Sequence, residues 1–140
     1  MKVELVRVDD AFHMEARNEQ GNVVSIDGSP AIGGSNKGAR PMELLAMGLG
    51  GCSAIDIISI LKKQRQEITG FRIEVDAERE PDAVPSLFQS MHVIYHLEGK
   101  DLDRTKVSRA VDLSMGTYCS VTKTLEKTAK ITYAFTVNGE

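Results

Sequence analysis

Two cysteines, Cys52 and Cys119, are the residues of this sequence with the clearest capacity for chemistry. In a pair of thiols, peroxide can convert one thiolate to a sulfenic acid, and the second thiol can then condense with it to a disulfide. Sixty-seven residues separate the two cysteines, so they are not a CxxC pair and only the fold can bring them together. The alternative is that each is a small buried apolar residue without chemistry.

Three glycines, Gly48, Gly50 and Gly51, immediately precede Cys52 in a segment expected to be helical. Each glycine inside a helix costs about 1 kcal/mol relative to alanine. Such a cost is tolerated where another element or a ligand approaches the backbone closely. The pattern therefore predicts either tight helix packing or a thiol in a narrow, partly dry slot.

A reactive thiol at Cys52 requires a nearby positive group, because the thiolate is the nucleophile. If the helix begins at Pro41, Cys52 lies about three turns inside it, beyond the reach of the helix dipole. Arg17 and Arg40 are the candidate cations, and Glu43 is the candidate acid that orients such an arginine. Each also has an ordinary interpretation, as a surface arginine or as a favourable acid at a helix start.

The spacing along the helix indicates whether the acidic residues Glu43 and Asp56 can lie on the same face as Cys52. Glu43 precedes Cys52 by nine residues, which is half a turn out of phase in a straight helix. The two can meet only if the glycine-rich stretch breaks the helix, or if Glu43 serves a partner subunit. Asp56 lies one turn after Cys52 on the same face, where it would raise rather than lower the pKa of a neighbouring thiol.

Cys119 is expected in the first turn of a short helix capped by Thr117. There the helix dipole would stabilise a thiolate, so Cys119 is a candidate resolving thiol. The histidines indicate no metal site, because His92 and His96 lie on an alternating strand pattern that separates them by about 13 Å. The glycines of segment 28–40 do not match a phosphate-binding loop, and we expect no cofactor.

The hydrophobic pattern predicts an α+β protein with a single domain, residues 1–140. The expected elements follow in chain order: strands over 3–8, 12–16 and 23–26, a mobile loop over 28–40, a helix over 41–66, strands over 71–77 and 91–97, a helix over 103–115, a third helix carrying Cys119, and a strand over 131–137. The long helix is apolar nearly all round from Leu44 to Leu61, which is typical of a buried helix. A small sheet cannot cover that much apolar surface, so we infer a homodimer.

Composition excludes several classes of partner. The chain has 140 residues and a net charge of −3, with both signs interspersed. This distribution indicates neither nucleic-acid binding nor attachment to a membrane surface. We expect no stretch long and apolar enough to cross a bilayer, no signal peptide, and a cytoplasmic location where thiols stay reduced.

Two motifs resemble those of the OsmC/Ohr family, and most closely its YhfA-like branch. The first is Pro41-Met42-Glu43-Leu44-Leu45-Ala46-Met47-Gly48-Leu49-Gly50-Gly51-Cys52-Ser53-Ala54-Ile55-Asp56, and the second is Tyr118-Cys119-Ser120-Val121. The resemblance implies an OsmC-like fold, with two antiparallel-type sheets around a long buried cysteine-bearing helix. It also implies an intertwined homodimer with its active sites at the interface.

The same resemblance implies chemistry for the two cysteines. Cys52 would attack an organic hydroperoxide and become a sulfenic acid, Cys119 would resolve it to a disulfide, and a dithiol of the lipoyl type would reduce the product. An Arg–Glu pair would activate Cys52, with Arg17 or Arg40 as the arginine. Met42 stands where the peroxidase members carry their glutamate, and Glu43 matches the YhfA-like pattern instead.

Two classes of function follow from these observations. The first is a thiol peroxidase, a redox enzyme that reduces organic hydroperoxides. The alternative is a non-catalytic, stress-related protein that binds a small apolar ligand, or a redox sensor on the same dimeric fold.

Overall fold

The computed structural model describes all residues from Met1 to Glu140, and it confirms the α+β class. The chain contains two compact units, Met1–Leu45 and Ala46–Glu140, which are described separately below. The long helix α1 (Pro41–Lys63) begins in the first unit and continues into the second. That the whole chain is a single domain remains a prediction.

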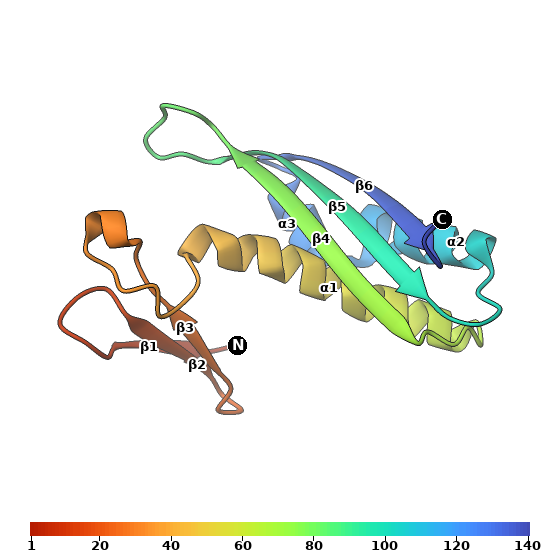
Figure 1. Cartoon of the computed structure of the whole chain (residues 1–140), viewed down its shortest axis with the longest axis horizontal. Coiled ribbons are helices and arrows are strands. Elements are labelled where there is room, and N and C mark those ends of the chain that lie inside the picture. The colour runs from red at the N-terminus through yellow and green to blue at the C-terminus, as the bar shows by residue number, and fades with distance from the viewer. The chain divides into compact units, whose positions relative to one another are not determined.

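The N-terminal unit is an antiparallel sheet in the order β1-β2-β3 (Figure 1), as the alternating pattern predicted. Its strands are β1 (Val3–Arg7), β2 (Met14–Asn18) and β3 (Val23–Ile26), followed by the short 3₁₀ turn η1 (Pro30–Ile32). No apolar residue of this unit is buried, and most of its large apolar side chains are about half exposed: Val3, Leu5, Val6, Val8, Phe12, Val23, Val24 and Ile32. This unit therefore has no hydrophobic core of its own.

The glycine-rich segment 28–40 is a connection, but it is tied down rather than mobile as predicted. The buried Asp27 carboxylate accepts hydrogen bonds from the backbone N–H groups of Gly28, Ser35 and Lys37, at 2.7, 3.2 and 3.0 Å. These bonds, that from Lys37 most strongly, hold the pKa of Asp27 below its ordinary value. At Gly34 an added Cβ would lie 1.9 Å from the Gly28 carbonyl oxygen, so the backbone passes too close for any side chain.

The C-terminal unit contains a second three-stranded sheet in the order β4-β5-β6. Strands β4 (Gly70–Arg79) and β5 (Phe88–Glu98) are antiparallel, whereas β6 (Lys130–Val137) runs parallel to β5. The expectation of two antiparallel-type sheets is therefore corrected for β6. A parallel pair needs a long crossover, and here α2 (Arg104–Leu113), the π turn η2 (Ser114–Tyr118) and α3 (Ser120–Leu125) supply it.

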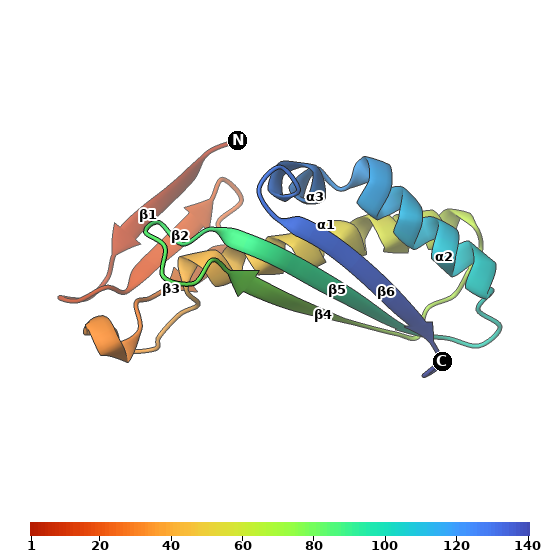
Figure 2. The ribbon, with the colours of Figure 1, turned by 90° about the horizontal axis from the view of Figure 1, so that it is seen from above.

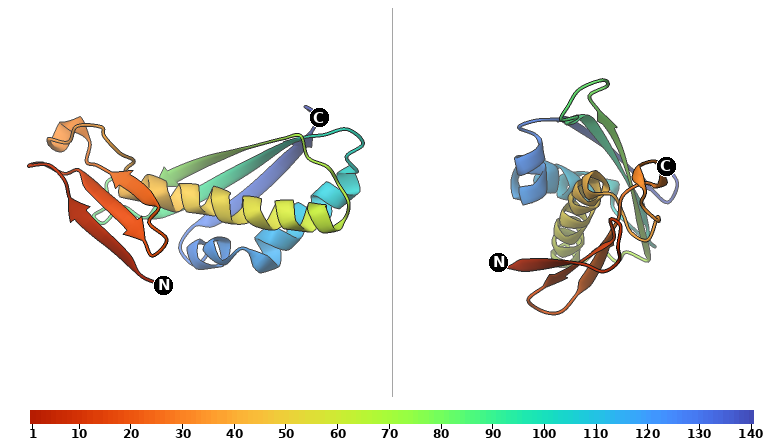
Figure 3. Two further views of the ribbon diagram at one scale, coloured as in Figure 1. Left: turned by 90° about the horizontal axis from the view of Figure 1, so that it is seen from below. Right: turned by 90° about the vertical axis from the view of Figure 1, so that its left-hand side faces the viewer.

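All three helices of this unit cover the same face of its sheet (Figures 2 and 3). Along β5, side chains alternate between the helix-covered face and solvent, as the sequence pattern predicted. The fully buried apolar core comes from β5, α1 and α2: Met91, Val93, Tyr95, Leu97, Leu49, Ile57, Leu61, Val107, Ala110 and Val111. The opposite face carries His92 and His96, whose rings contact Thr132 and Thr136 across the β5–β6 pair.

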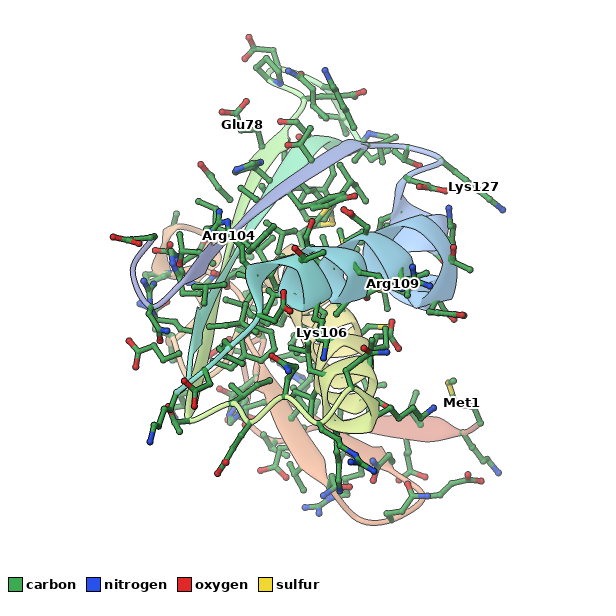
Figure 4. All side chains as sticks on the ribbon, turned by 90° about the vertical axis from the view of Figure 1, so that its right-hand side faces the viewer. Met1, Glu78, Arg104, Lys106, Arg109 and Lys127 are labelled. Atoms are coloured by element: carbon green, nitrogen blue, oxygen red, sulfur yellow. The ribbon has the colours of Figure 1, made fainter.

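Helix α2 is amphipathic, which explains how it covers the sheet. Its buried side is apolar, whereas Arg104 and Arg109 are exposed and Lys106 is half-buried (Figure 4). Asp103 caps its start by accepting hydrogen bonds from the backbone N–H groups of the first turn. The Arg104 guanidinium stacks over the Phe135 ring of β6, with its central carbon 4.7 Å from the ring centroid.

Within the single chain, helix α1 is buried on one side only, as expected if a small sheet cannot cover all of its apolar surface. Leu49, Ser53, Ile57 and Leu61 form the buried line, at the four-residue spacing of one helix face. On another side, Met47 is 57%, Ile55 71% and Ile58 46% exposed. In the single chain this apolar side has no cover.

The apolar character of α1 also corrects the expectation about membrane-spanning segments. By length and composition alone, α1 is long and apolar enough to cross a bilayer, with a mean hydropathy of 1.9 in its most apolar window. The core helix of a globular protein meets the same criteria, so this is weak support for a membrane span. One face of α1 packs on the β4-β5-β6 sheet, which is the role of a core helix.

Candidate functional site

The fold brings Cys52 and Cys119 together, as the sequence-based prediction required. Their two Sγ atoms and one carboxylate oxygen of Asp56 all lie within 4.8 Å of one another. Cys52 and Asp56 are one turn apart on α1, while Cys119 lies at the junction between η2 and α3. Both cysteines are free thiols, Cys52 half-buried and Cys119 fully buried. We call these three residues the thiol cluster.

Cys119 is itself the N-cap of α3, which corrects the assignment of Thr117 to that position. Its Sγ accepts a hydrogen bond from the backbone N–H of Thr122 at 3.3 Å. Thr117 lies inside the preceding π turn, where it has no capping role. The wider π turn delays the start of α3, and the backbone N–H of Cys119 donates to the Ser114 carbonyl oxygen at 2.8 Å.

Burial raises the pKa of the Cys119 thiol above its ordinary value of 9.0. Hydrogen bonds from Thr122 oppose this shift, and the neighbouring Cys52 thiol adds to it. The expectation of a dipole-stabilised thiolate at Cys119 is therefore wrong. Desolvation of a fully buried sulfur outweighs the N-terminus of a six-residue helix.

The Asp56 carboxylate is held in place by a hydrogen bond from the π turn η2. The hydroxyl of the buried Ser114 donates to Asp56 Oδ2 at 2.9 Å. Asp56 forms no ion pair with any lysine, arginine or histidine of the chain. Sequence reasoning noted Asp56 only as unfavourable to a thiolate at Cys52, and no sequence signal singled out Ser114.

A dry, sulfur-rich group packs beside the thiol cluster. The Tyr95 hydroxyl donates to Met115 Sδ at 3.0 Å, and the Thr122 hydroxyl lies 3.5 Å from the same sulfur. Burial raises the pKa of Tyr95 to about 12, and the nearby Cys119 and Asp56 contribute to that rise. Tyr95 is therefore a neutral hydrogen-bond donor here and not a phenolate.

The three glycines before Cys52 have different surroundings. A Cβ added to Gly50 would contact Val75 and Ile73 of β4 at 3.4 and 3.7 Å, so this glycine faces the sheet. An added Cβ at Gly48 or Gly51 would meet nothing within 4 Å in this chain. The packing interpretation therefore holds for Gly50, while Gly48, one turn before Cys52, leaves open space on that side of the thiol.

The other three predicted site residues lie in the N-terminal unit. Arg17 forms an exposed ion pair with Glu15 at 3.1 Å. The Arg40 guanidinium donates to the carbonyl oxygens of Asp27 and Gly38 and to the Asn36 side chain. These contacts occupy both arginines within their own unit.

Glu43 plays the helix-start role that the sequence allowed. Its carboxylate accepts a 2.7 Å hydrogen bond from the backbone N–H of Arg40. Helix α1 runs without interruption from Pro41 to Lys63, so the break that would align Glu43 with Cys52 does not occur. Activation of Cys52 by Glu43 and an arginine therefore remains a prediction.

Comparison with known proteins agrees with the resemblance of the motifs. Residues 34–134 match the family model described as OsmC-like protein. The chain is 40% identical over 117 residues to Protein YhfA of Escherichia coli K12, a match that covers 84% of each chain.

Solved structures show the same fold. A hypothetical protein from Aquifex aeolicus has a TM-score of 0.79 at 29% identity, covering 98% of this chain and 96% of its own. The organic hydroperoxide resistance protein OhrB of Bacillus subtilis has a TM-score of 0.63 at 23% identity, covering 96% of both chains. The family-model match covers most of this chain and the similarity to Protein YhfA extends over 84% of it, so the chain belongs to the OsmC-like protein family.

Proposed function

We propose that this protein is a cytoplasmic thiol peroxidase that reduces organic hydroperoxides through Cys52 and Cys119. The observation that supports this most directly is the proximity of the two sulfurs, within 4.8 Å, although 67 residues separate them in the sequence. Membership of the OsmC-like family and the fold shared with a hydroperoxide resistance protein agree with it.

The proposed reaction has two thiol steps. The Cys52 thiolate attacks the distal peroxide oxygen, the O–O bond breaks, and the products are a Cys52 sulfenic acid and the substrate's alcohol after one proton is taken up. The Cys119 thiol then attacks the sulfenic sulfur, which forms the disulfide and releases water. A dithiol reductant, of the lipoyl type, returns both cysteines to thiols and becomes a disulfide itself.

Burial supports this division of roles. Cys52 is half-buried and can meet a substrate, whereas Cys119 is fully buried and has only to reach Cys52. The surrounding side chains are largely apolar or weakly polar, including Met115 and Tyr95. Such surroundings suit a hydroperoxide with an apolar body better than hydrogen peroxide.

We also propose that the active form is an intertwined homodimer with the thiol cluster at the interface. The N-terminal unit lacks a core of its own, and Met47, Ile55 and Ile58 leave one side of α1 uncovered. Large contiguous apolar surfaces are rare on monomeric proteins and mark interaction sites. A second subunit would cover these surfaces, and Arg17, Arg40 and Glu43 are the proposed activating residues across that interface.

The test is oxidation of the reduced protein with cumene hydroperoxide. We expect one Cys52–Cys119 disulfide per chain by non-reducing mass spectrometry, together with formation of the alcohol. Cys52→Ser should abolish peroxide consumption, and Cys119→Ser should leave a sulfenic acid that dimedone traps. Free thiols that persist under excess hydroperoxide would rule the peroxidase out.

A second candidate is a non-catalytic small-molecule-binding protein or redox sensor, and Asp56 is the observation that favours it. A carboxylate without a cationic partner lies beside both sulfurs, and negative charge disfavours a thiolate. Met42 at the position of the peroxidase glutamate agrees with this candidate. Saturable binding of a small apolar ligand without peroxide consumption would identify it.

A further inference from the structure

We propose that Cys52, Cys119 and Asp56 bind one thiophilic divalent cation, with Zn²⁺ as the best match. The sequence indicated no metal site, because that reasoning rested on the histidines. The structure instead assembles two sulfurs and a carboxylate oxygen from α1 and the start of α3 within 4.8 Å of one another. This inference concerns the reduced protein, and it does not depend on whether the thiols reduce peroxide.

The chemistry of the donors points to a specific class of metal. Thiolates select borderline and soft ions such as Zn²⁺, whereas Mg²⁺ and Ca²⁺ require sets of oxygen ligands. Two cysteines and one acid amount to three protein ligands, which leaves the fourth tetrahedral position for water or a substrate. Zinc sites that are purely structural usually fill all four positions with protein ligands.

The separations within the cluster suit such an ion after a small contraction. Zinc bonds of about 2.3 Å to sulfur and 2.0–2.2 Å to oxygen place tetrahedral ligand atoms about 3.6–3.8 Å apart. The three candidate ligand atoms lie no more than 4.8 Å apart. A contraction of about 1 Å in these separations would bring the three atoms to zinc-binding distances.

Charge and orientation give independent support. Asp56 has no cationic side chain paired with it, so its carboxylate lacks a counter-charge in this chain. A divalent ion would supply that counter-charge beside the buried Cys119 sulfur. The Ser114 hydrogen bond fixes one Asp56 oxygen at 2.9 Å, in the way that outer hydrogen bonds orient metal-ligating carboxylates.

The ion would also have a way in. Cys52 and Asp56 are only half-buried, and the space beside Gly48, one turn before Cys52, is open in this chain. Binding replaces the two thiol protons with the metal, so two protons are released for each ion bound. A disulfide removes two of the three ligands, so the metal-bound and oxidised states exclude each other.

The test uses the full-length reduced protein, stripped of metal with a chelator. Titration with Co²⁺ should give thiolate-to-cobalt charge-transfer absorption and tetrahedral d–d bands that saturate at one ion per chain, and Zn²⁺ should displace them. Cys52→Ser and Cys119→Ser each remove one of the two thiolates. In each variant the charge-transfer band should therefore fall to half its intensity or less. Asp56→Asn should weaken Zn²⁺ binding about tenfold or more, because an amide is a poorer ligand.

Asp112→Asn is the matched control, since Asp112 is an exposed acid of α2 that bonds to Tyr133 instead. It should bind Zn²⁺ as the unsubstituted protein does. Alkylation of Cys52, the accessible thiol of the folded wild-type protein, offers a second control, because it removes one thiolate and should weaken the charge-transfer band by half or more even if a cysteine variant misfolds. Absence of that band in reduced wild-type protein, or equal affinities of Asp56→Asn and Asp112→Asn, would overturn the proposal. Peroxide consumption, measured separately with chelator present, reports on the peroxidase proposal alone.

Discussion

The hydroxyl of Ser114 donates a 2.9 Å hydrogen bond to the Asp56 carboxylate, and this bond joins α1 to the π turn that leads into Cys119. It ties together the two segments that carry the cysteines. Because Ser114 is fully buried and its acceptor is charged, the bond should contribute to both stability and site geometry.

Removing this bond should therefore destabilise the protein. For Ser114→Ala we expect the free energy of unfolding in urea to fall by about 1–2 kcal/mol, near the lower range for hydrogen bonds to charged groups because Asp56 is only half-buried. Ser108→Ala, which removes a half-buried hydroxyl from α2, is the control and should change stability little. Equal effects of the two substitutions would contradict this assignment.

The two thiols should differ in their reaction with an alkylating agent. Cys119 is fully buried and its pKa is raised above 9.0, so its alkylation should lag well behind that of Cys52. The fold favours the neutral Cys119 thiol over the thiolate. The contribution of Cys119 to stability is therefore complete below pH 9.0 and is lost as the pH rises through the higher pKa of the folded state. Mass spectrometry of the native protein at increasing pH measures this order. Equal rates at both cysteines would show that Cys119 is accessible.

Acid stability should depend on Asp27. Its pKa lies below 3.8 in the folded chain because three backbone N–H groups bond its carboxylate. The stabilisation is therefore present above pH 3.8 and is lost as the pH falls through the lower folded value. In Asp27→Asn, the melting temperature should be lower at neutral pH and should vary less with pH in the acid range. Asp10→Asn, at an exposed acid, should keep the wild-type profile, and a parallel change in both variants would refute the role of Asp27.

The exposed apolar side of α1 predicts a dimer, and a single charged substitution on that side should disrupt it. Ile55 is 71% exposed in the single chain, so Ile55→Glu should leave the C-terminal unit's core intact but place a charge in the proposed interface. Light scattering after size-exclusion chromatography should show a dimer for the wild type and a marked shift to monomer for Ile55→Glu. Thr105→Glu, at an exposed position of α2, is the control and should remain dimeric. A monomeric wild-type protein would contradict the dimer.

Local sequence patterns were sufficient to predict much of the secondary structure of this protein. Alternation along 91–97 correctly predicted which side chains of β5 face the core, because strand side chains alternate with a period of two. The first helix began at Pro41 as predicted, since proline suits a helix start. The cysteine motifs, read together with their neighbours, correctly predicted the family.

The remaining features depend on contacts between residues far apart in the sequence. Alternation predicts that 131–137 is a strand but not its direction, so the parallel pairing of β6 with β5 was missed. The π turn that makes Cys119 an N-cap has no strong residue signature, and the desolvation that raises the pKa of Cys119 depends on elements packed over it.

The sequence by itself determined that two thiols exist, that one lies on a long apolar helix, and which family the motifs resemble. Only the tertiary structure decided that Cys52, Cys119 and Asp56 share one small volume and that Ser114 holds the acid there. The physical reason is that periodicity and propensity act over a few residues, whereas the meeting of α1 with the start of α3 is set by how both pack on the same sheet.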